Sequence, residues 1–211
     1  MYKERFNINK NSLNSIKNRF RKLLPIVIDI ETTGLNPNIH AILEIAIITL
    51  KMSKLGWLKK DFILHFHIKP FKNCKINKKS LFLNKLDPFN PLRFAISEQE
   101  ALKSIFQITK KKIKKNECKK GVIIAHNGYF DHSFLMKAIK RNNMSKKIFH
   151  NFTIFDTATL SALVLGQTVL SKSCKAMGIS FNHSKAHSAL YDAIKTAELF
   201  CKIINFFKKV N

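Results

Sequence analysis

Hydrophobic positions divide the first part of the chain into short apolar runs of the kind that form strands. Three such runs, rich in β-branched residues, are separated by turn residues at Gly34–Pro37 and at Gly56. The runs cover Leu24–Ile30, Leu43–Met52 and Phe62–Ile68. Strands joined this closely favour antiparallel pairing. A loop follows, with prolines at Pro70, Pro88 and Pro91.

The rest of the chain alternates helical and strand patterns. Ser97 and Glu100 match a Ser-x-x-Glu capping box, and apolar residues recur after it at helical spacing, so we predict a helix that begins at Ser97. The all-apolar run Gly121–Ala125 is typical of a strand covered on both faces. Further expected elements are a helix through Phe134–Ile139, a strand over Phe152–Phe155, helical segments at about 157–165 and 169–177, and a final helix from about Ala186 to Lys208.

This order of elements predicts an α/β fold with a mixed central sheet flanked by helices. The 211 residues suffice for one domain with a substantial core. Neither an internal repeat nor a Gly/Ser/Pro-rich linker divides them. We therefore predict a polar N-terminal extension over residues 1–18 and a single domain over residues 19–211.

The charge balance points to a polyanionic partner. The chain has 38 Lys and Arg residues against 13 Asp and Glu residues, which gives a net charge of +25. A field of that sign concentrates polyanions, and nucleic acid is the usual one. Most of the excess is Lys in a chain also rich in Asn, Ile and Phe, which an AT-rich genome would produce without selection for binding. Charge therefore supports a nucleic-acid partner without deciding it.

Other compositional features exclude several classes of protein. The four cysteines form no Cys-x-x-Cys pair, so neither a zinc knuckle nor a disulfide framework is indicated. His65 and His67 share a strand face and could chelate zinc, but no third ligand has suitable spacing. No uninterrupted apolar stretch approaches the roughly 20 residues of a membrane span. We expect a soluble, cytoplasmic protein with no membrane partner.

Acidic residues occur in three separated motifs that are candidates for metal chemistry. Asp29 and Glu31 end the first strand, and their side chains converge because residues two apart in a strand share a face. Asp131 follows the all-apolar strand, at the sheet edge where α/β folds collect ligands. His187 and Asp192 lie about one turn apart near the start of the final helix.

Carboxylates held this close resist joint ionisation unless a cation neutralises them, and Mg²⁺ or Mn²⁺ prefers such hard oxygen ligands. Each motif alone has a plainer explanation. The first would be a solvated strand end, Asp131 a helix cap, and His187 a structural histidine. Only the occurrence of all three motifs in this order favours a metal-dependent catalytic site.

In order, spacing and element type, the three motifs resemble the DEDDh exonucleases. Longer strings resemble the ribonuclease T family within that superfamily. They include Pro25-Ile-Val-Ile-Asp-Ile-Glu-Thr-Thr-Gly34, Leu64-His-Phe-His67, Gly166-Gln-Thr-Val-Leu-Ser-Lys172 and Ala186-His-Ser-Ala-Leu-Tyr-Asp192. The similarity extends over nearly the whole chain, from Arg19 to Lys208.

The resemblance implies a ribonuclease H-like exonuclease fold and 3′→5′ exoribonuclease activity that releases nucleoside 5′-monophosphates from transfer RNA and other stable RNA. It implies two Mg²⁺ ions, for which Mn²⁺ can substitute. Asp29 would bridge both ions, Glu31 and Asp192 would complete one site, and Asp131 would support the other. His187 would be the general base, or would itself touch a metal. The strand-end residue Asp156 would support the site or be structural.

The resemblance also implies substrate contacts and a homodimer. Phe130 and Phe152 keep the family's base-stacking phenylalanines, whereas Leu35 and Leu83 replace two others. Lys79 stands where the family has Glu, so base preference is open. Basic residues of one subunit would guide RNA to the other subunit's active site. The matching positions here are Arg19, Arg21, Lys114 and Lys120.

Three alternatives remain open from the residues alone. The first is another DEDDh exonuclease of the DNA-proofreading type, and single-stranded DNA is in any case an open second substrate. The second is an oligoribonuclease, which degrades only very short RNA. The third, from a different class, is a basic RNA-binding protein without catalytic activity.

Overall fold

The computed structural model describes residues 14–210 of the 211 in the chain. Most of the expected polar extension, residues 1–13, lies outside the described residues. Helix α1 (Ile16–Arg19) lies in its last part, with Ser15 as its N-cap. Ile16 is only 2% exposed and belongs to the main core. Helix α1 therefore packs against the sheet through Ile16.

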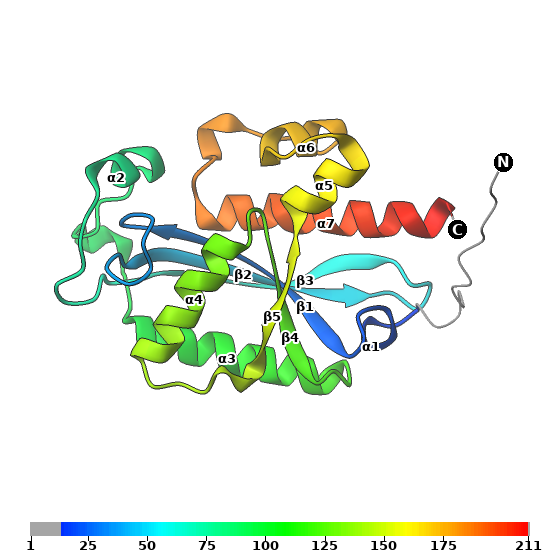
Figure 1. Ribbon diagram of the computed structural model, residues 1–211, viewed down its shortest axis with the longest axis horizontal. Coiled ribbons are helices and arrows are strands. Elements are labelled where there is room, and N and C mark those ends of the chain that lie inside the picture. The colour runs from blue at the N-terminus through cyan, green and yellow to red at the C-terminus, as the bar shows by residue number, and fades with distance from the viewer. Residues whose placement is uncertain (1–13, 211) are drawn as a thin grey trace.

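One mixed sheet of five strands organises the molecule (Figure 1). Its strands lie in the order β3-β2-β1-β4-β5. Their bounds are β1 Leu23–Thr32, β2 Ile42–Met52, β3 Leu58–His67, β4 Lys120–Ala125 and β5 Phe149–Asp156. The first three pair antiparallel, whereas β4 pairs parallel to β1 and β5 pairs parallel to β4. The predicted α/β class, mixed sheet and antiparallel start are confirmed.

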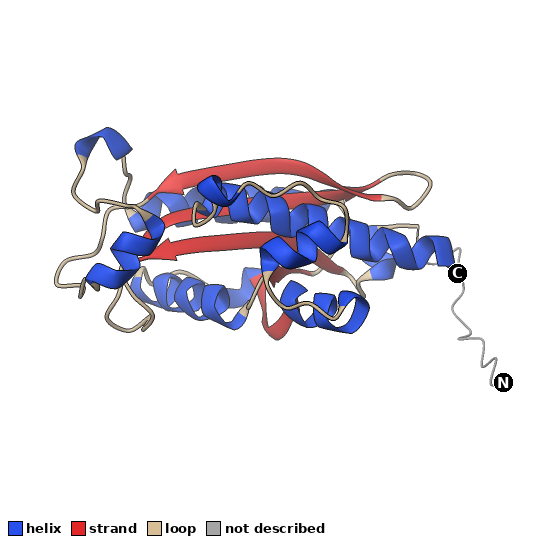
Figure 2. Ribbon diagram, turned by 90° about the horizontal axis from the view of Figure 1, so that it is seen from above, coloured by secondary structure: helices blue, strands red, loops and turns tan. Residues whose placement is uncertain are grey.

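Helices cover both faces of this sheet (Figures 1 and 2). The longest, α7, packs on β1, β2 and β3 from one side, and α5 and α6 pack on α7. On the other side α3 and α4 contact the sheet. The helices are α2 Lys78–Asn84, α3 Glu98–Lys115, α4 Tyr129–Arg141, α5 Thr157–Leu165, α6 Leu170–Ala176 and α7 Ala189–Val210, with short 3₁₀ turns at Pro91–Arg93, Lys146–Ile148 and His183–Lys185. Among the described residues, no helix is both long and apolar enough to cross a bilayer.

Two helices differ from the sequence-based expectation. The proline-containing loop holds α2, whose N-cap Asn77 accepts hydrogen bonds from the N–H groups of Lys79 and Ser80. This seven-residue helix has no clear apolar periodicity, so the pattern missed it. The predicted capping box at Ser97 and Glu100 is present at the start of α3. By contrast, the final helix begins at Ala189 and not at Ala186, for a reason that concerns His187 and is described below.

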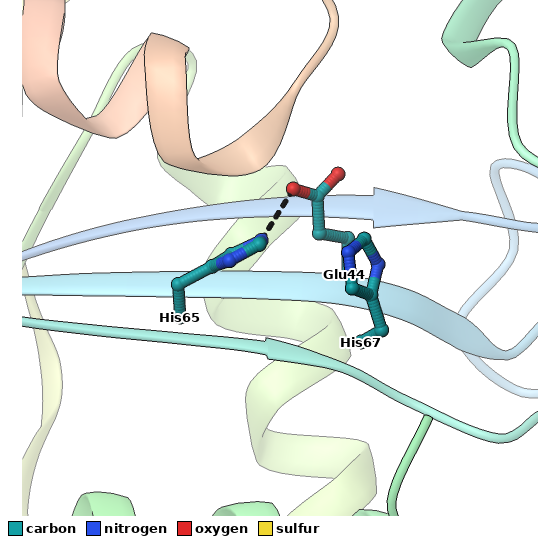
Figure 3. Close-up of side chains that lie close together, drawn as sticks. All are labelled: Glu44, His65 and His67. Atoms are coloured by element: carbon teal, nitrogen blue, oxygen red, sulfur yellow. Dashed lines mark hydrogen bonds and ion pairs between the residues drawn. The ribbon is translucent and has the colours of Figure 1, made fainter. Parts of the chain in front are cut away.

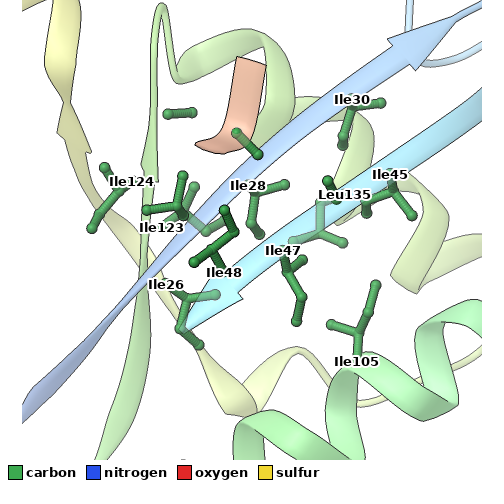
Figure 4. Close-up of a cluster of buried hydrophobic side chains, with 14 of the residues drawn as sticks. Ile26, Ile28, Ile30, Ile45, Ile47, Ile48, Ile105, Ile123, Ile124 and Leu135 are labelled. Atoms are coloured by element: carbon green, nitrogen blue, oxygen red, sulfur yellow. The ribbon is translucent and has the colours of Figure 1, made fainter. Parts of the chain in front are cut away.

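Strand parity in β1 separates the hydrophobic core from the acidic residues. Ile28 and Ile30 are buried with Ile105 of α3 and Leu135 of α4 (Figure 4). Side chains that alternate along a strand point to opposite faces, so Asp29 and Glu31 point to the face that α7 covers. The apolar residues on one face of β1 pack in the core. The acidic residues on the other face are therefore available for a functional site.

Candidate active site

The carboxylates of the three predicted motifs converge at the C-terminal end of β1. Asp131 lies in the first turn of α4 and is 4% exposed, and Asp192 lies in the first turn of α7 and is 9% exposed. Burial raises the pKa of Asp29 well above its ordinary value, and the charges of Asp131, Asp192 and Glu31 raise it further. Groups influence one another in this way only at short range, so the four carboxylates share one site.

The arrangement of these carboxylates fits divalent cations. Burial and the charges of Glu44 and Asp192 raise the pKa of Glu31 to about 8. Burial also raises the pKa of Asp192, although the His187 N–H opposes that shift. Asp192 Oδ1 is buried, and no group in the described part of the chain hydrogen-bonds to it. Such a cluster of oxygen donors with an unpartnered buried oxygen suits Mg²⁺ or Mn²⁺.

His187 lies beside this cluster, in the loop before α7. A ring nitrogen of His187 and carboxylate oxygens of Glu31 and Asp192 all lie within 4.8 Å of one another. The His187 backbone N–H also donates to Asp192 Oδ2 at 2.9 Å. The expectation that His187 lies on the final helix is wrong, because its φ of 63° is left-handed and ends helical geometry there. The pairing of His187 with Asp192 is nevertheless observed.

Asp131 and Asp156 have different local roles. The N-cap of α4 is Gly128, which makes no side-chain hydrogen bond, so Asp131 is not the helix cap of the plainer interpretation. Asp131 instead accepts from the backbone N–H of Ile30, which ties α4 to β1. Asp156 is the N-cap of α5 and also accepts from the Asn127 N–H at 3.0 Å. Asp156 therefore holds the loop that leads to α4.

Two residues at the site were missed by sequence reasoning. Asn84 at the end of α2 donates to the Thr32 carbonyl at 3.1 Å and hydrogen-bonds to Glu31. Glu44 on β2 is paired with Glu31 in the sheet register and is 3% exposed. A detectable signal existed for Glu44, since a lone carboxylate inside a continuous apolar run is rarely buried without a partner. Asn84 gave no such signal.

The expectation that His65 and His67 lack a third metal-type ligand is also wrong. Glu44 on β2 lies beside the two histidines, which are on the adjacent strand β3. One ligand atom from each of the three lies within 4.8 Å of the others (Figure 3). His65 Nε2 is 2.5 Å from Glu44 Oε1. Spacing along the chain could not reveal this group, because it arises from cross-strand pairing of Glu44 with His67.

Comparisons with known proteins agree with this geometry. An exonuclease family model, RNase T, matches residues 26–200. Ribonuclease T of Buchnera aphidicola subsp. Schizaphis graminum is 58% identical, over 92% of this chain and 89% of that protein. Ribonuclease T of Yersinia pestis is 51% identical, over 95% of this chain and 94% of that protein. The chain belongs to the ribonuclease T family.

Solved structures support the fold assignment. The nuclease domain of 3′hExo, a DEDDh family member bound to rAMP, superposes with a TM-score of 0.67 at 18% identity, covering 86% of this chain and 92% of that one. Exonuclease I of E. coli in complex with a dT13 oligonucleotide has the same TM-score at 16% identity, covering 89% of this chain and 43% of that one. The expected exonuclease fold is confirmed. This member of the ribonuclease T family is a metal-dependent 3′→5′ exoribonuclease.

The expected base-stacking positions of this ribonuclease T family member differ in exposure. Phe152 on β5 is 88% exposed, whereas Phe130 is partly buried, its ring centroid 4.8 Å from that of Phe134. Leu35, Leu83 and Lys79 are exposed, the last two on α2. Because Asn84 of the same helix contacts Glu31, α2 borders the acidic site.

The expected basic contacts lie at the other end of the sheet. Arg19 and Arg21 precede β1 and line a pocket with Phe20, and Lys120 begins β4 beside Leu23. Lys114 lies near the end of α3 in a second pocket with Lys110 and Lys119. The acidic cluster is at the opposite end of β1, and a ten-residue strand spans about 30 Å. Within one chain, these cations do not meet the acidic site.

Replacing Glu31 with Gln should stabilise the metal-free protein at alkaline pH. The folded-state pKa of Glu31 is raised from 4.5 to about 8, so its stabilising contribution is complete below pH 4.5 and is lost as pH rises through 8. Glutamine does not ionise, so in chelator at pH 8 the variant should be more stable by on the order of 1–3 kcal/mol. Urea unfolding at pH 4.5 and pH 8 measures the difference. If the difference in unfolding free energy between the variant and wild type is the same at both pH values, the prediction is wrong.

Proposed function

We propose that this protein trims the 3′ ends of structured RNAs, including transfer RNA and other stable RNA, by two-metal-ion hydrolysis at the acidic cluster. The observation that carries the proposal is the convergence of Asp29, Glu31, Asp131 and Asp192 beside His187. Each hydrolysis step releases a nucleoside 5′-monophosphate. Mg²⁺ is the proposed natural ion, with Mn²⁺ as a substitute, and the cytoplasm is the proposed compartment.

The side chains have distinct roles in this proposal. The four carboxylates would hold the two ions, and Asp29 would be the central ligand, since the charges of the other three all raise its pKa. When bound, the ions supply Lewis acidity for the attacking water and the leaving oxygen. His187 accepts the proton of the attacking water at a ring nitrogen. Its exposure and its place beside Glu31 and Asp192 support this role.

Replacing Phe152 with Ala should weaken RNA binding more than catalysis. An exposed aromatic ring can stack on a terminal base, and such stacking contributes about 1–3 kcal/mol per base. We expect KM for a short single-stranded RNA to rise roughly tenfold or more, with little change in kcat. Phe206→Ala is the matched control, because Phe206 is an exposed phenylalanine far along α7 from Asp192. Equal KM values for the two variants would refute the stacking role.

We propose that the enzyme acts as a homodimer. The separation of the basic residues from the acidic cluster within one chain supports an arrangement in which each subunit guides RNA to its partner. Mixing subunits tests it: Asp29→Asn protein and Arg19→Ala/Arg21→Ala protein, each poorly active alone, should together regain activity. A monomeric mass in light scattering, or no gain on mixing, would contradict the dimer.

An RNA hairpin with a short 3′ overhang distinguishes the proposed substrate from its rivals. Trimming should remove overhang residues and stop near the duplex. Degradation limited to two- to five-nucleotide RNAs would favour an oligoribonuclease, and preference for the DNA version of the hairpin would favour a proofreading-type enzyme. Binding without hydrolysis in Mg²⁺ would favour the non-catalytic alternative.

A further inference from the structure

Glu44 is the buried carboxylate closest in the sheet register to the proposed site, yet none of the three acidic motifs contains it. Its Cα is paired with that of Glu31 across β1 and β2, and with that of His67 across β2 and β3. The side chain is almost inaccessible to solvent, at 4% exposure. A carboxylate in this position is stable only when other groups hydrogen-bond to it.

Those hydrogen bonds come from two different parts of the fold. His65 on β3 donates from Nε2 to Glu44 Oε1 at 2.5 Å, as Figure 3 shows. From the start of α7, the Ser188 hydroxyl donates to the same oxygen at 3.3 Å, and the Ala189 backbone N–H also donates to the carboxylate. Glu44 therefore connects β3 to the N-terminus of α7.

The contact with Ala189 makes Glu44 a helix cap supplied by the sheet. The first N–H groups of a helix have no intrahelical acceptor, and a negative charge near them interacts favourably with the helix dipole. Burial alone would raise the pKa of Glu44, but the bonds from His65 and Ala189 outweigh burial and hold that pKa below its ordinary value.

The segment that Glu44 contacts also carries the proposed catalytic residues. Asp192 N–H donates to the Ser188 carbonyl at 2.9 Å, and His187 N–H donates to Asp192 Oδ2 at the same distance. His187, Ser188 and Asp192 therefore form one hydrogen-bonded unit, and Glu44 holds that unit against β2. Glu44 is itself paired with Glu31 in the sheet register, so it lies between β1 and the first turn of α7 at the site.

The two histidines differ in their connection to this unit. His65 contacts Glu44 directly, whereas the His67 ring packs edge-on against His65 with centroids 5.0 Å apart. His67 Nδ1 is buried, and no hydrogen-bond partner for it occurs in residues 14–210. His67 therefore restrains the orientation of His65 by packing.

We infer that Glu44, oriented by His65, is a positioning residue of the hydrolytic site that fixes His187 and Asp192 relative to Glu31. The inference rests on the proposed function of the acidic cluster. It assigns no bond-making or bond-breaking to Glu44, which acts only through the first turn of α7.

Glu44→Ala and Glu44→Gln test this role. Loss of a group that orients metal ligands commonly reduces metal affinity or activity by about 10–100-fold. We expect that range of loss in kcat for Glu44→Ala, with KM for RNA unchanged, and weaker Mn²⁺ binding in electron paramagnetic resonance titrations without RNA. Glu44→Gln keeps an acceptor for the Ala189 N–H and should therefore recover part of the kcat and part of the Mn²⁺ affinity. Glu98→Ala is the matched control: Glu98 is also a buried, ion-paired carboxylate, but it begins α3, and its partner Arg141 ends α4.

A double-mutant cycle shows whether His65 acts through Glu44. His65→Ala should reduce kcat and Mn²⁺ affinity in the wild-type background and have little further effect in the Glu44→Ala background. Additive losses would overturn the inference. So would Glu44→Ala losses no larger than those of Glu98→Ala, which would indicate a purely structural carboxylate.

Three further outcomes separate the competing explanations. If Zn²⁺ stabilises the Asp29→Asn protein and His67→Ala removes that stabilisation, Glu44, His65 and His67 are a metal site and the positioning role is wrong. If Asp29→Asn is inactive but Glu44→Ala behaves like wild type, only this inference fails. If Asp29→Asn remains active, the proposed function itself fails.

Discussion

Asp29→Asn protein should hydrolyse RNA at least about 10³-fold more slowly than wild type, because several kcal/mol of metal-ion stabilisation are lost and each 1.4 kcal/mol is tenfold in rate. Asp29 is the central member of the cluster, since Asp131, Asp192, Glu31 and Glu44 all influence its pKa. Asparagine has nearly the shape of aspartate and keeps one side-chain oxygen, but it has no negative charge. Single-turnover cleavage of a 3′-labelled RNA in Mg²⁺ measures the effect.

The variant should nevertheless fold, because removing one of several buried like charges relieves repulsion in the metal-free protein. We therefore expect Asp29→Asn to bind RNA in chelator as tightly as wild type and to lose the stabilisation that Mn²⁺ gives to wild type. Asp61→Asn is the matched control, since Asp61 lies on the same sheet but pairs with Lys112 and Lys51. Similar cleavage rates for wild type and Asp29→Asn would exclude a catalytic acidic cluster.

The parts of the fold predicted well are those with strong local patterns. The apolar runs of β1, β2 and β4 are buried along most of their length, and the Ser97 capping box appears as expected. Helix α2 was missed because tertiary contacts stabilise it. Asn84 at its end is held by β1 and not by any apolar stripe. The start of α7 was misplaced because apolar spacing does not reveal a left-handed residue such as His187.

The site was predictable to the extent that strand parity and motif order apply. Parity alone brings Asp29 and Glu31 to one face. Position along the chain made Asp131, His187 and Asp192 candidates, and the family resemblance joined them to the first two residues in one site. The second layer, Glu44 with His65, depends on the register between β2 and β3 and on the docking of α7. Spacing along the chain reveals neither the strand register nor the docking of the helix. Glu44 and His65 are therefore recognised as part of the site only in three dimensions.

His187→Asn should lower kcat by about 10²–10⁴-fold, the usual contribution of a general base, while the fold and RNA binding are retained. The backbone at His187 has a φ of 63°, a conformation that Asn and Gly tolerate better than most residues, so neither substitution should disturb the loop.

His187→Gly offers a sharper test, because removing the side chain leaves space for a free imidazole molecule at an exposed position. Added imidazole should then restore part of the rate, and more imidazole should restore more until it saturates. His183→Asn is the control, since His183 is a nearby exposed histidine whose ring packs on Phe181. A wild-type rate for His187→Asn, or a His187→Gly rate that imidazole does not change, would show that another group accepts the proton.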